Sequence, residues 1–225
     1  MKKTFEQQEY DRLWSDENDA YSAERLGYTP HFLRFMDAQL AEVPAPRAIL
    51  EIGCGDGFFS SQLANRDCNV TGIDLSAEGI AKAKRRVPSG VFREHDLANP
   101  LPFADASFDA IWCSEVLEHL FAPLSVLEEA FRVLRPGGRM LITVPYHGLL
   151  KNLGIALFAF DRHYDPTYPH IRFYTKNTLS GLVRRAGLDP YFVGTCGSSL
   201  GLRDWLVPTN ILLAARKPGL APLAK

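Results

Sequence analysis

The stretch Ile49–Ser60, ILEIGCGDGFFS, decides the fold of this chain, because an apolar strand runs directly into a glycine-rich turn and then into a helix. The turn holds three glycines, Gly53, Gly55 and Gly57. Glycine has no Cβ, so the backbone there adopts unusual dihedral angles and lies directly against a ligand, and the start of the next helix offers free N–H groups. The stretch predicts an α/β protein that binds a nucleoside-bearing cofactor in this turn, although a glycine turn alone is also compatible with a structural loop.

The glycine spacing discriminates between cofactors. In the dinucleotide-binding fingerprint a third glycine stands three residues after the second, where helix and strand pack closely beside the pyrophosphate. Phe58 occupies that position, and Asp56 would place a carboxylate beside the pyrophosphate, so a nicotinamide dehydrogenase is disfavoured. With Glu51 two residues upstream of the first glycine, the turn instead resembles motif I of the class I S-adenosylmethionine (SAM) dependent methyltransferases. In that family the acidic residues face a cofactor that carries an ammonium and a sulfonium.

A further acidic residue follows the next predicted strand, Val70–Ile73. Asp74 comes about 20 residues after the first glycine, where nucleotide-binding α/β units place the acid that binds the ribose hydroxyls. An Asp at a strand end can instead cap the next helix, but Ser76 directly precedes the predicted helix Ser76–Val87 and is the better N-cap candidate. We therefore predict that Asp74 binds the ribose, with Leu75 beside it.

The segment Val91–Leu120, VFREHDLANPLPFADASFDAIWCSEVLEHL, resembles motifs II and III of the same family. The resemblance implies that Asp96 accepts a hydrogen bond from the adenine amino group, that the Leu97 N–H meets the ring, and that Ser114 and Glu115 join the cofactor site. Taken alone, Asp96 is better explained as a turn residue. The order of the motifs favours the cofactor role.

Further matches extend the resemblance over more than half of the chain. They are Leu134–Pro145, LRPGGRMLITVP, at a helix-to-strand junction, and His170–Leu188; Asp109 is expected to be structural. The last two strands are expected at Leu188–Val193 and Asn210–Arg216. The resemblance implies a Rossmann-like, mostly parallel seven-stranded sheet with helices on both faces and an antiparallel last strand. The predicted cofactor-binding residues are Glu51, Gly53, Cys54, Gly55, Asp56, Gly57, Asp74, Leu75, Asp96, Leu97, Ser114 and Glu115.

Two regions lie outside the alternating pattern of strands and helices. Residues 1–44 are rich in aromatics and are predicted to be helical, either as a cap over the site or as a helix pair packed on the sheet; residues 45–225 form the methyltransferase domain. Residues 146–170 are predicted to be an insertion after the fifth strand that covers the substrate. Within it, the apolar segment Leu153–Phe160 either contacts a hydrophobic acceptor or a membrane surface, or is ordinary core.

A possible metal site follows the fourth strand. If a helix begins by Glu115, then Glu115, Glu118 and His119 share one face, an arrangement that suits a hard divalent cation. This E-x-x-E-H also resembles the ubiquinone-pathway O-methyltransferases and the small-RNA 2′-O-methyltransferases, in which a later histidine before an aromatic-Thr segment completes a metal site. His170 matches that histidine, so the resemblance implies Mg²⁺ or another divalent cation held by Glu115, Glu118, His119 and His170. Two alternatives stay open: Glu118 and His119 as catalytic residues, with His119 a general base or substrate contact, and a purely structural helix start.

The composition limits the kinds of partner and the cell compartment that we expect for this protein. A net charge of −1 gives no electrostatic footprint for nucleic acid. The four cysteines form no C-x-x-C pair, so neither a zinc site nor a disulfide framework is indicated, and reduced thiols suit the cytoplasm. The N-terminus lacks the apolar run of a signal peptide, and no apolar stretch reaches the ~18 residues of a membrane span.

These observations predict an enzyme that moves a methyl group from SAM to a small-molecule acceptor, and a hydroxyl oxygen is the atom we expect to be methylated. The aromatic and apolar segments outside the sheet favour a hydrophobic or aromatic acceptor. Two other functions are retained as alternatives: a nucleic-acid methyltransferase, which the E-x-x-E-H likeness favours and the charge opposes, and a non-catalytic protein that binds SAM or its product S-adenosylhomocysteine (SAH).

Overall fold

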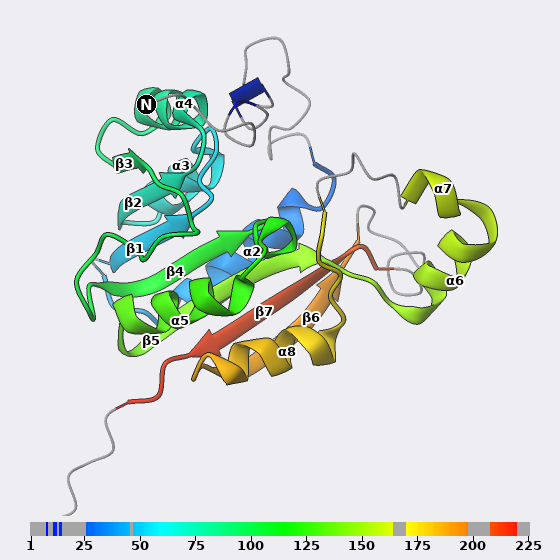
Figure 1. The fold of residues 1–225 in the computed structure, drawn as a ribbon. Helices are drawn as coiled ribbons and strands as arrows, with labels where there is room; N and C mark the ends of the chain where they lie inside the picture. The colour runs from blue at the N-terminus through cyan, green and yellow to red at the C-terminus, as the bar shows by residue number, and fades with distance from the viewer. Residues whose placement is uncertain are drawn as a thin grey trace, which may run out of the picture.

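The computed structural model describes residues 8, 11, 12, 14, 26–45, 47–163, 170–197 and 208–219. These residues form one seven-stranded sheet with helices on both faces (Figure 1). In chain order the elements are α2 (Thr29–Leu40), β1 (Arg47–Ile52), α3 (Phe58–Ala64), β2 (Cys68–Asp74), α4 (Ala77–Arg86), β3 (Val91–Glu94), β4 (Phe108–Ser114), the 3₁₀ helix η3 (Leu117–His119), α5 (Pro123–Val133), β5 (Leu134–Pro145), α6 (Leu149–Phe158), α7 (Phe160–His163), α8 (Lys176–Arg185), β6 (Asp189–Cys196) and β7 (Asn210–Arg216).

The strand order across the sheet is β3-β2-β1-β4-β5-β7-β6. Strands β1 to β5 are parallel to one another, and β7 runs antiparallel to both β5 and β6. The predicted seven-stranded, mostly parallel sheet with an antiparallel last strand is confirmed. Because β2 lies on one side of β1 and β4 on the other, the chain changes direction across the sheet at this point, and a crevice opens beyond the carboxyl ends of these strands.

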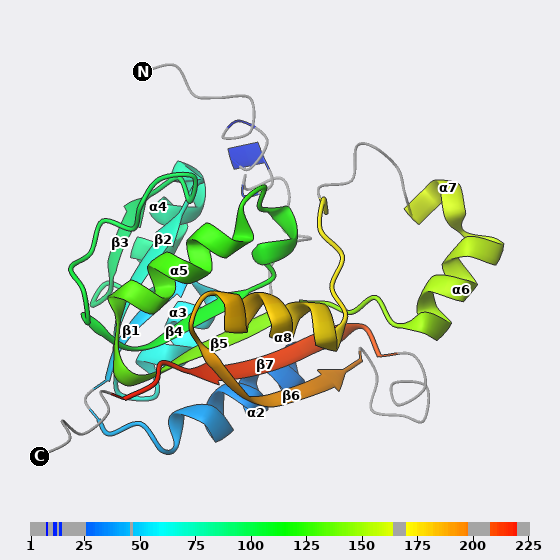
Figure 2. The same ribbon diagram turned by 60° about the horizontal axis from the view of Figure 1, so that its bottom comes forward.

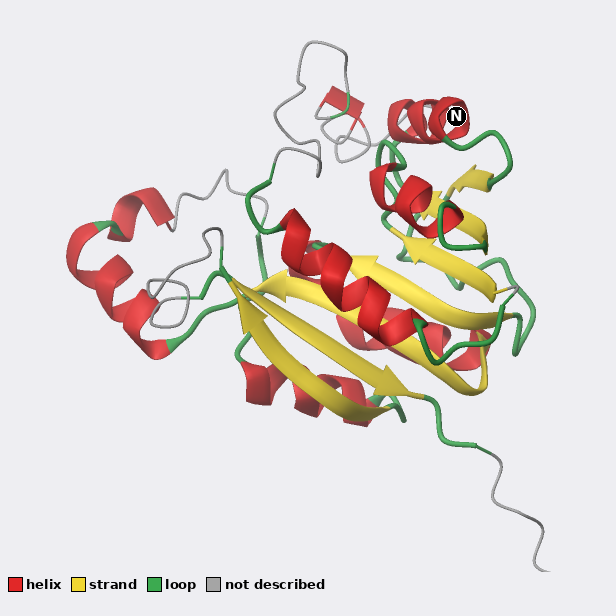
Figure 3. Cartoon of the chain, turned by 180° about the vertical axis from the view of Figure 1, so that it is seen from behind, coloured by secondary structure: helices red, strands yellow, loops and turns green. Residues whose placement is uncertain are grey.

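Both faces of the sheet are buried, which explains the near-continuous apolar sequence of the central strands. In β4, Ala110 and Trp112 belong to the core cluster on the side of α2 and α3, whereas Ile111 and Cys113 belong to the cluster on the side of α5 and α8. The two layers of helices are visible in Figure 2, and in Figure 3, the view from the opposite side to Figure 1, α2 lies in front of the sheet and crosses it. The period of two in β4 therefore places successive side chains in two separate cores.

Side-chain caps fix the starts of two helices. The Ser76 hydroxyl accepts the Gly79 N–H at 3.1 Å at the start of α4, as predicted, and α4 ends in a basic last turn that suits the helix dipole. Thr175 and Thr178 form a reciprocal capping box at the start of α8. Helix α4 therefore begins where its sequence predicts.

The N-terminal region does not act only as a cap. Helix α2 packs on the sheet, where the rings of Phe35 and Trp112 lie 6.1 Å apart and Arg139 donates to the Gln39 carbonyl at 2.6 Å. The packed-helix interpretation is thus correct for α2. Most of the first 25 residues lie outside the described part, so the boundary between a cap of 1–44 and a domain of 45–225 stays a prediction.

The insertion after β5 contains α6 and α7, which stand apart from the sheet in Figures 1 and 2. No side chain of α6 is buried, and Leu157 and Phe158 are 64% and 87% exposed. The interpretation of Leu153–Phe160 as ordinary core is therefore wrong, because this helix lies beyond the carboxyl end of β5 and does not pack on a face of the sheet. Among the described residues, no helix combines the length and the apolar composition that crossing a membrane requires.

Candidate active site

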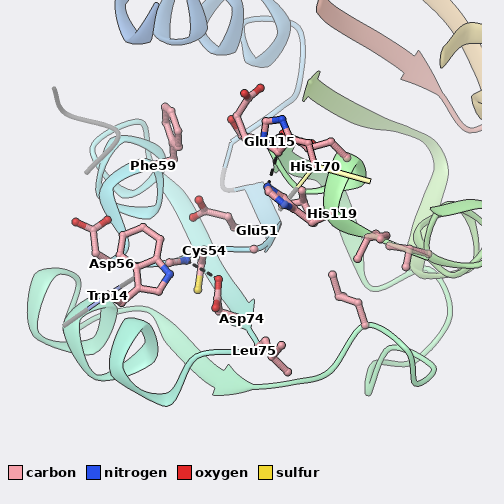
Figure 4. A pocket seen from close by; sticks show the side chains of 18 of the residues that line it. Trp14, Glu51, Cys54, Asp56, Phe59, Asp74, Leu75, Glu115, His119 and His170 are labelled. Atoms are coloured by element: carbon pink, nitrogen blue, oxygen red, sulfur yellow. Dashed lines mark hydrogen bonds and ion pairs between the residues drawn. The ribbon is translucent and has the colours of Figure 1, made fainter. Parts of the chain in front are cut away.

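A cavity of about 590 Å³ lies beyond the carboxyl ends of β1, β2 and β4. It contains every predicted cofactor-binding residue except Gly57, and it also contains Glu118, His119 and His170. Figure 4 shows Asp56 and Asp74 at one end of this pocket and Glu115, His119 and His170 at the other, with Glu51 between them. One cavity therefore joins the two parts of the site that the sequence predicts separately.

The glycine turn forms the floor of the first end. The N–H groups of Gly53 and Cys54 both donate to the Ile73 carbonyl, at 2.8 and 3.0 Å, which fastens the turn to the end of β2. Gly53 and Gly55 have φ values of 73° and 47°, a region that favours glycine. Gly57 also has a positive φ, but it faces helix α4: a Cβ there would lie 2.8 Å from the Ala83 Cα, so its visible role is helix packing.

Asp74 stands at the centre of this end. Its Oδ2 accepts the Gly55 N–H and its Oδ1 accepts the Ser76 N–H, both at 2.8 Å. Burial raises the pKa of this carboxyl. Each oxygen has a second lone pair, so Asp74 both orders the start of α4 and can accept from a further donor such as a ribose hydroxyl.

Two more acids line the cavity in contrasting environments. Glu51 is buried and accepts the Ser60 hydroxyl, and burial raises its pKa to about 8. Asp56 is ion-paired with Arg86 at 3.0 Å and accepts the Phe58 N–H at 3.1 Å. A cofactor ammonium at Asp56 would therefore share this carboxylate with Arg86.

Asp96 supports both interpretations that its sequence allows. Its Oδ1 accepts the Ala98 N–H at 2.8 Å, which is an Asx turn, yet the residue also lines the cavity beside Leu97. Asp109, expected to be structural, accepts the Ala48 N–H at 2.8 Å and pairs with Arg135, and it does not line the cavity. The adenine contact of Asp96 stays a prediction.

The chain after β4 departs from the expected helix. Glu115 has a φ of 54°, and only the short 3₁₀ helix η3 follows it, so Glu115 does not share a helical face with Glu118 and His119. The expectation of a helix beginning at Glu115 is wrong because the left-handed residue turns the chain away from helical geometry. The Glu115 carboxylate instead accepts from the Thr143 hydroxyl at 3.0 Å and the Asn210 amide at 3.1 Å, and burial raises its pKa to about 7.

Glu118, His119 and His170 nevertheless meet. Glu118 Oε1 lies 3.9 Å from His119 Nε2 and 4.0 Å from His170 Nε2, and one ligand atom from each of the three residues lies within 4.8 Å of the others. The N–H groups of Ile171 and Arg172 both donate to the Glu118 carbonyl at 3.0 Å, which holds His170 beside η3. Glu115 lies outside this group, so its role as a metal ligand stays a prediction.

The electrostatics of the group favour a cation. Glu118 has no exposed surface, and neither carboxylate oxygen has a hydrogen-bond donor among the described residues. Burial and the nearby Glu115 raise the pKa of Glu118, whereas burial and the nearby His119 lower that of His170 to about 4. A buried carboxylate without a donor, beside the His119 imidazole and the His170 imidazole that is neutral near pH 7, is a fitting donor set for a divalent ion with ligand distances of about 2.0–2.6 Å.

The sequence motifs do not predict several of the residues that line the cavity or hold its side chains. The sequence indicated only that the N-terminal region is rich in aromatics, and the structure places Trp14, Tyr28 and Phe32 in the cavity wall. Thr143 and Asn210 hold Glu115 from strands far along the chain, and no local pattern marks them. They therefore become recognisable only once the sheet is assembled.

Comparisons with known proteins identify the family of this chain. Residues 50–142 match the family described as "Methyltransferase domain". The chain is 31% identical over 157 residues to the ubiquinone biosynthesis O-methyltransferase of Dechloromonas aromatica, covering 65% of this chain and 66% of that protein. The chain belongs to the class I SAM-dependent methyltransferases.

A second sequence relative and a solved structure resemble this methyltransferase in sequence and in fold, respectively. It is 32% identical over 153 residues to the malonyl-[acyl-carrier protein] O-methyltransferase of Enterobacter lignolyticus, covering 67% of this chain and 59% of that protein. Its fold matches a putative methyltransferase solved in complex with the Haloferax volcanii Trm112 methyltransferase activator, with a TM-score of 0.70, 20% identity, and coverage of 93% of this chain and 98% of that one. Because the two sequence alignments span less than two thirds of the relatives' lengths, the acceptor has to be argued from the site.

Proposed function

We propose that this methyltransferase transfers the methyl group of SAM to a hydroxyl oxygen of a small-molecule acceptor. One observation carries the proposal: a single cavity joins the glycine turn and Asp74 to the cluster of Glu118, His119 and His170. The first part suits a nucleoside-bearing cofactor, and the second part suits an oxygen nucleophile that must lose a proton.

The cofactor occupies the end of the cavity formed by the glycine turn. The backbone of Gly53 and Gly55 lies against its methionine portion beside Asp56, Asp74 binds the ribose hydroxyls, and Asp96 and the Leu97 N–H bind the adenine. SAM supplies a methyl group that its sulfonium already activates. The protein therefore has to align the acceptor, exclude water and assist loss of the hydroxyl proton.

Glu118, His119 and His170 hold a divalent cation at the acceptor end. The buried Glu118 oxygens without donors support this assignment, because a cation would satisfy both of them. Such an ion would lower the pKa of the acceptor hydroxyl and orient its oxygen. Without an ion, His119 is the candidate general base, because its ring lines the same cavity.

The acceptor is a hydrophobic or aromatic hydroxyl compound. Apolar and aromatic side chains make up much of the cavity wall beyond the cofactor residues, and a pocket of this kind binds an acceptor by burying its apolar surface. The side chains that support this assignment are Tyr28, Phe32, Phe59, Leu120, Phe121 and Val126.

The reaction takes place in a reducing compartment, the cytoplasm. Cys54, Cys68 and Cys113 are buried thiols that form no disulfide. Disulfides are rare where glutathione and thioredoxin keep thiols reduced, so these three thiols support this location.

The test is SAH formation with SAM and a panel of catechols, simple phenols and their methoxy analogues, with and without Mn²⁺. The proposal predicts turnover only when a free hydroxyl is present. His119→Asn should lower turnover at least about a hundredfold, the lower range of general acid–base effects. His31→Asn is the matched control, because His31 does not line the cavity. Equal turnover of the methoxy analogues would refute O-methylation.

A further inference from the structure

The indole of Trp14 lies directly on the glycine turn. A Cβ built on Gly55 would lie 2.6 Å from Trp14 Cη2 and would overlap the neighbouring ring carbon. Only glycine at this position lets the ring approach so closely. Trp14 also lines the cavity, and Figure 4 shows its ring beside Asp56, Cys54 and Asp74.

A second contact, three residues earlier in the chain, supports this placement. Asp11 precedes Trp14 by three residues. The Asp11 Oδ1 accepts the Ser76 hydroxyl at 2.7 Å and the Glu78 N–H at 3.3 Å. Asp11 therefore binds the start of helix α4, where Ser76 lies two residues beyond Asp74.

Helix α4 and the glycine turn form one supporting surface for these contacts. A Cβ on Gly79 would lie 3.1 Å from the Gly55 carbonyl oxygen, so the first turn of α4 packs tightly against the glycine turn. The Asp74 carboxylate bridges the two through the N–H groups of Gly55 and Ser76. Asp11 and Trp14 thus contact the same unit at two points.

The cavity of about 590 Å³ remains open with Trp14 in place, so the indole forms a wall and does not fill the site. We infer that Trp14 is a cofactor-positioning residue that closes the glycine-turn end of the cavity over bound SAM, and that Asp11 holds it in position. This inference rests on the proposed cofactor site. An indole beside the methionine portion excludes water and offers an aromatic surface to a ligand that carries an ammonium and a sulfonium.

The test is calorimetric titration of SAM and SAH into the full chain and four variants. Trp14→Ala should weaken binding of both ligands at least about tenfold, which corresponds to 1.4 kcal/mol. Trp14→Phe should restore most of the affinity, because a ring still covers the turn. Asp11→Ala should weaken binding less than Trp14→Ala. Arg12→Ala, an exposed neighbour that does not line the cavity, should bind like the wild type.

The double variant Asp11→Ala, Trp14→Ala tests whether Asp11 acts through Trp14. If Asp11 acts by holding the indole, the double variant binds SAM no more weakly than Trp14→Ala alone. Further loss in the double variant would overturn the role of Asp11. Wild-type affinity in Trp14→Ala would overturn the inference as a whole, whereas a wild-type protein that binds no SAM would remove the proposed cofactor site itself.

Discussion

Replacing Glu118 by glutamine should stabilise the metal-free protein and abolish its response to divalent cations. The Glu118 side chain is fully buried and its oxygens have no donor among the described residues. Burial and the nearby Glu115 raise its pKa well above 4.5, so between the unfolded and the folded pKa the folded protein binds a proton that the unfolded chain releases. Glutamine has nearly the same shape and needs no proton, so it avoids this cost.

The magnitude follows from the ordinary carboxyl pKa of 4.5. At pH 7, taking up a proton at such a group costs about 3 kcal/mol, and the cost does not grow further once the folded pKa exceeds the ambient pH. A raised folded pKa gives stability that is fully present below the unfolded pKa and is lost as pH rises. The advantage of Glu118→Gln should therefore vanish near pH 4.5 and reach up to about 3 kcal/mol at pH 7, or up to about 10 °C in melting temperature.

The assay is thermal unfolding at pH 5 and pH 7, with and without Mn²⁺. At a hundred times its dissociation constant, an ion that binds only the folded state adds about 2.7 kcal/mol. The wild type should show this gain at pH 7 and Glu118→Gln should not. Glu78→Gln, an exposed acid in the first turn of α4, is the matched control. A variant that is less stable than the metal-free wild type at pH 7, or that gains equally from Mn²⁺, would refute the reasoning.

Three further predictions concern the glycine turn, a buried acid and the exposed helix. Gly55→Ala should lower SAM affinity in calorimetry at least about tenfold, whereas Gly137→Ala, also at positive φ but facing open space, should not; equal affinities would exclude the close approach at Gly55. Because burial raises the pKa of Glu51 to about 8, the free energy of unfolding of the protein should fall by up to about 5 kcal/mol between pH 4.5 and pH 8. Urea unfolding of Glu51→Gln should lack this part of the pH dependence, and a pH dependence equal to that of the wild type would contradict the burial argument. Phe158→Ser should change the unfolding free energy by no more than about 0.5 kcal/mol, against about 2–5 kcal/mol for Leu127→Ala in the core; a large loss at Phe158 would mean that α6 packs on the body.

The cofactor end of the site was predictable because its residues are local to strand ends. In a parallel sheet the carboxyl ends of β1, β2 and β3 meet at one edge, so the order of Gly53, Asp74 and Asp96 along the chain is enough to predict that they converge. The structure places all three in one cavity. Helix starts such as Ser76 were also predictable, since an N-cap depends on a few adjacent residues.

The acceptor end was less predictable because it depends on non-local contacts. The positive φ of Glu115 is accompanied by hydrogen bonds from Thr143 and Asn210, which lie on β5 and β7. The same limit applies at the cofactor end, where the contact between Asp11 and Ser76 joins residues 65 positions apart. Hydrophobic periodicity alone does not distinguish a buried apolar helix from an exposed one, which is why α6 was open to misassignment.

Calorimetric titration of SAM into the wild-type protein and into Asp74→Ala tests the central claim most directly. Asp74 holds the glycine turn and the start of α4 through its two oxygens and faces the cavity. We expect one SAM bound per chain, with binding lost or strongly weakened in Asp74→Ala while circular dichroism shows that the variant is still folded. Absence of SAM binding to the wild type, or undiminished binding to a folded Asp74→Ala variant, would contradict it.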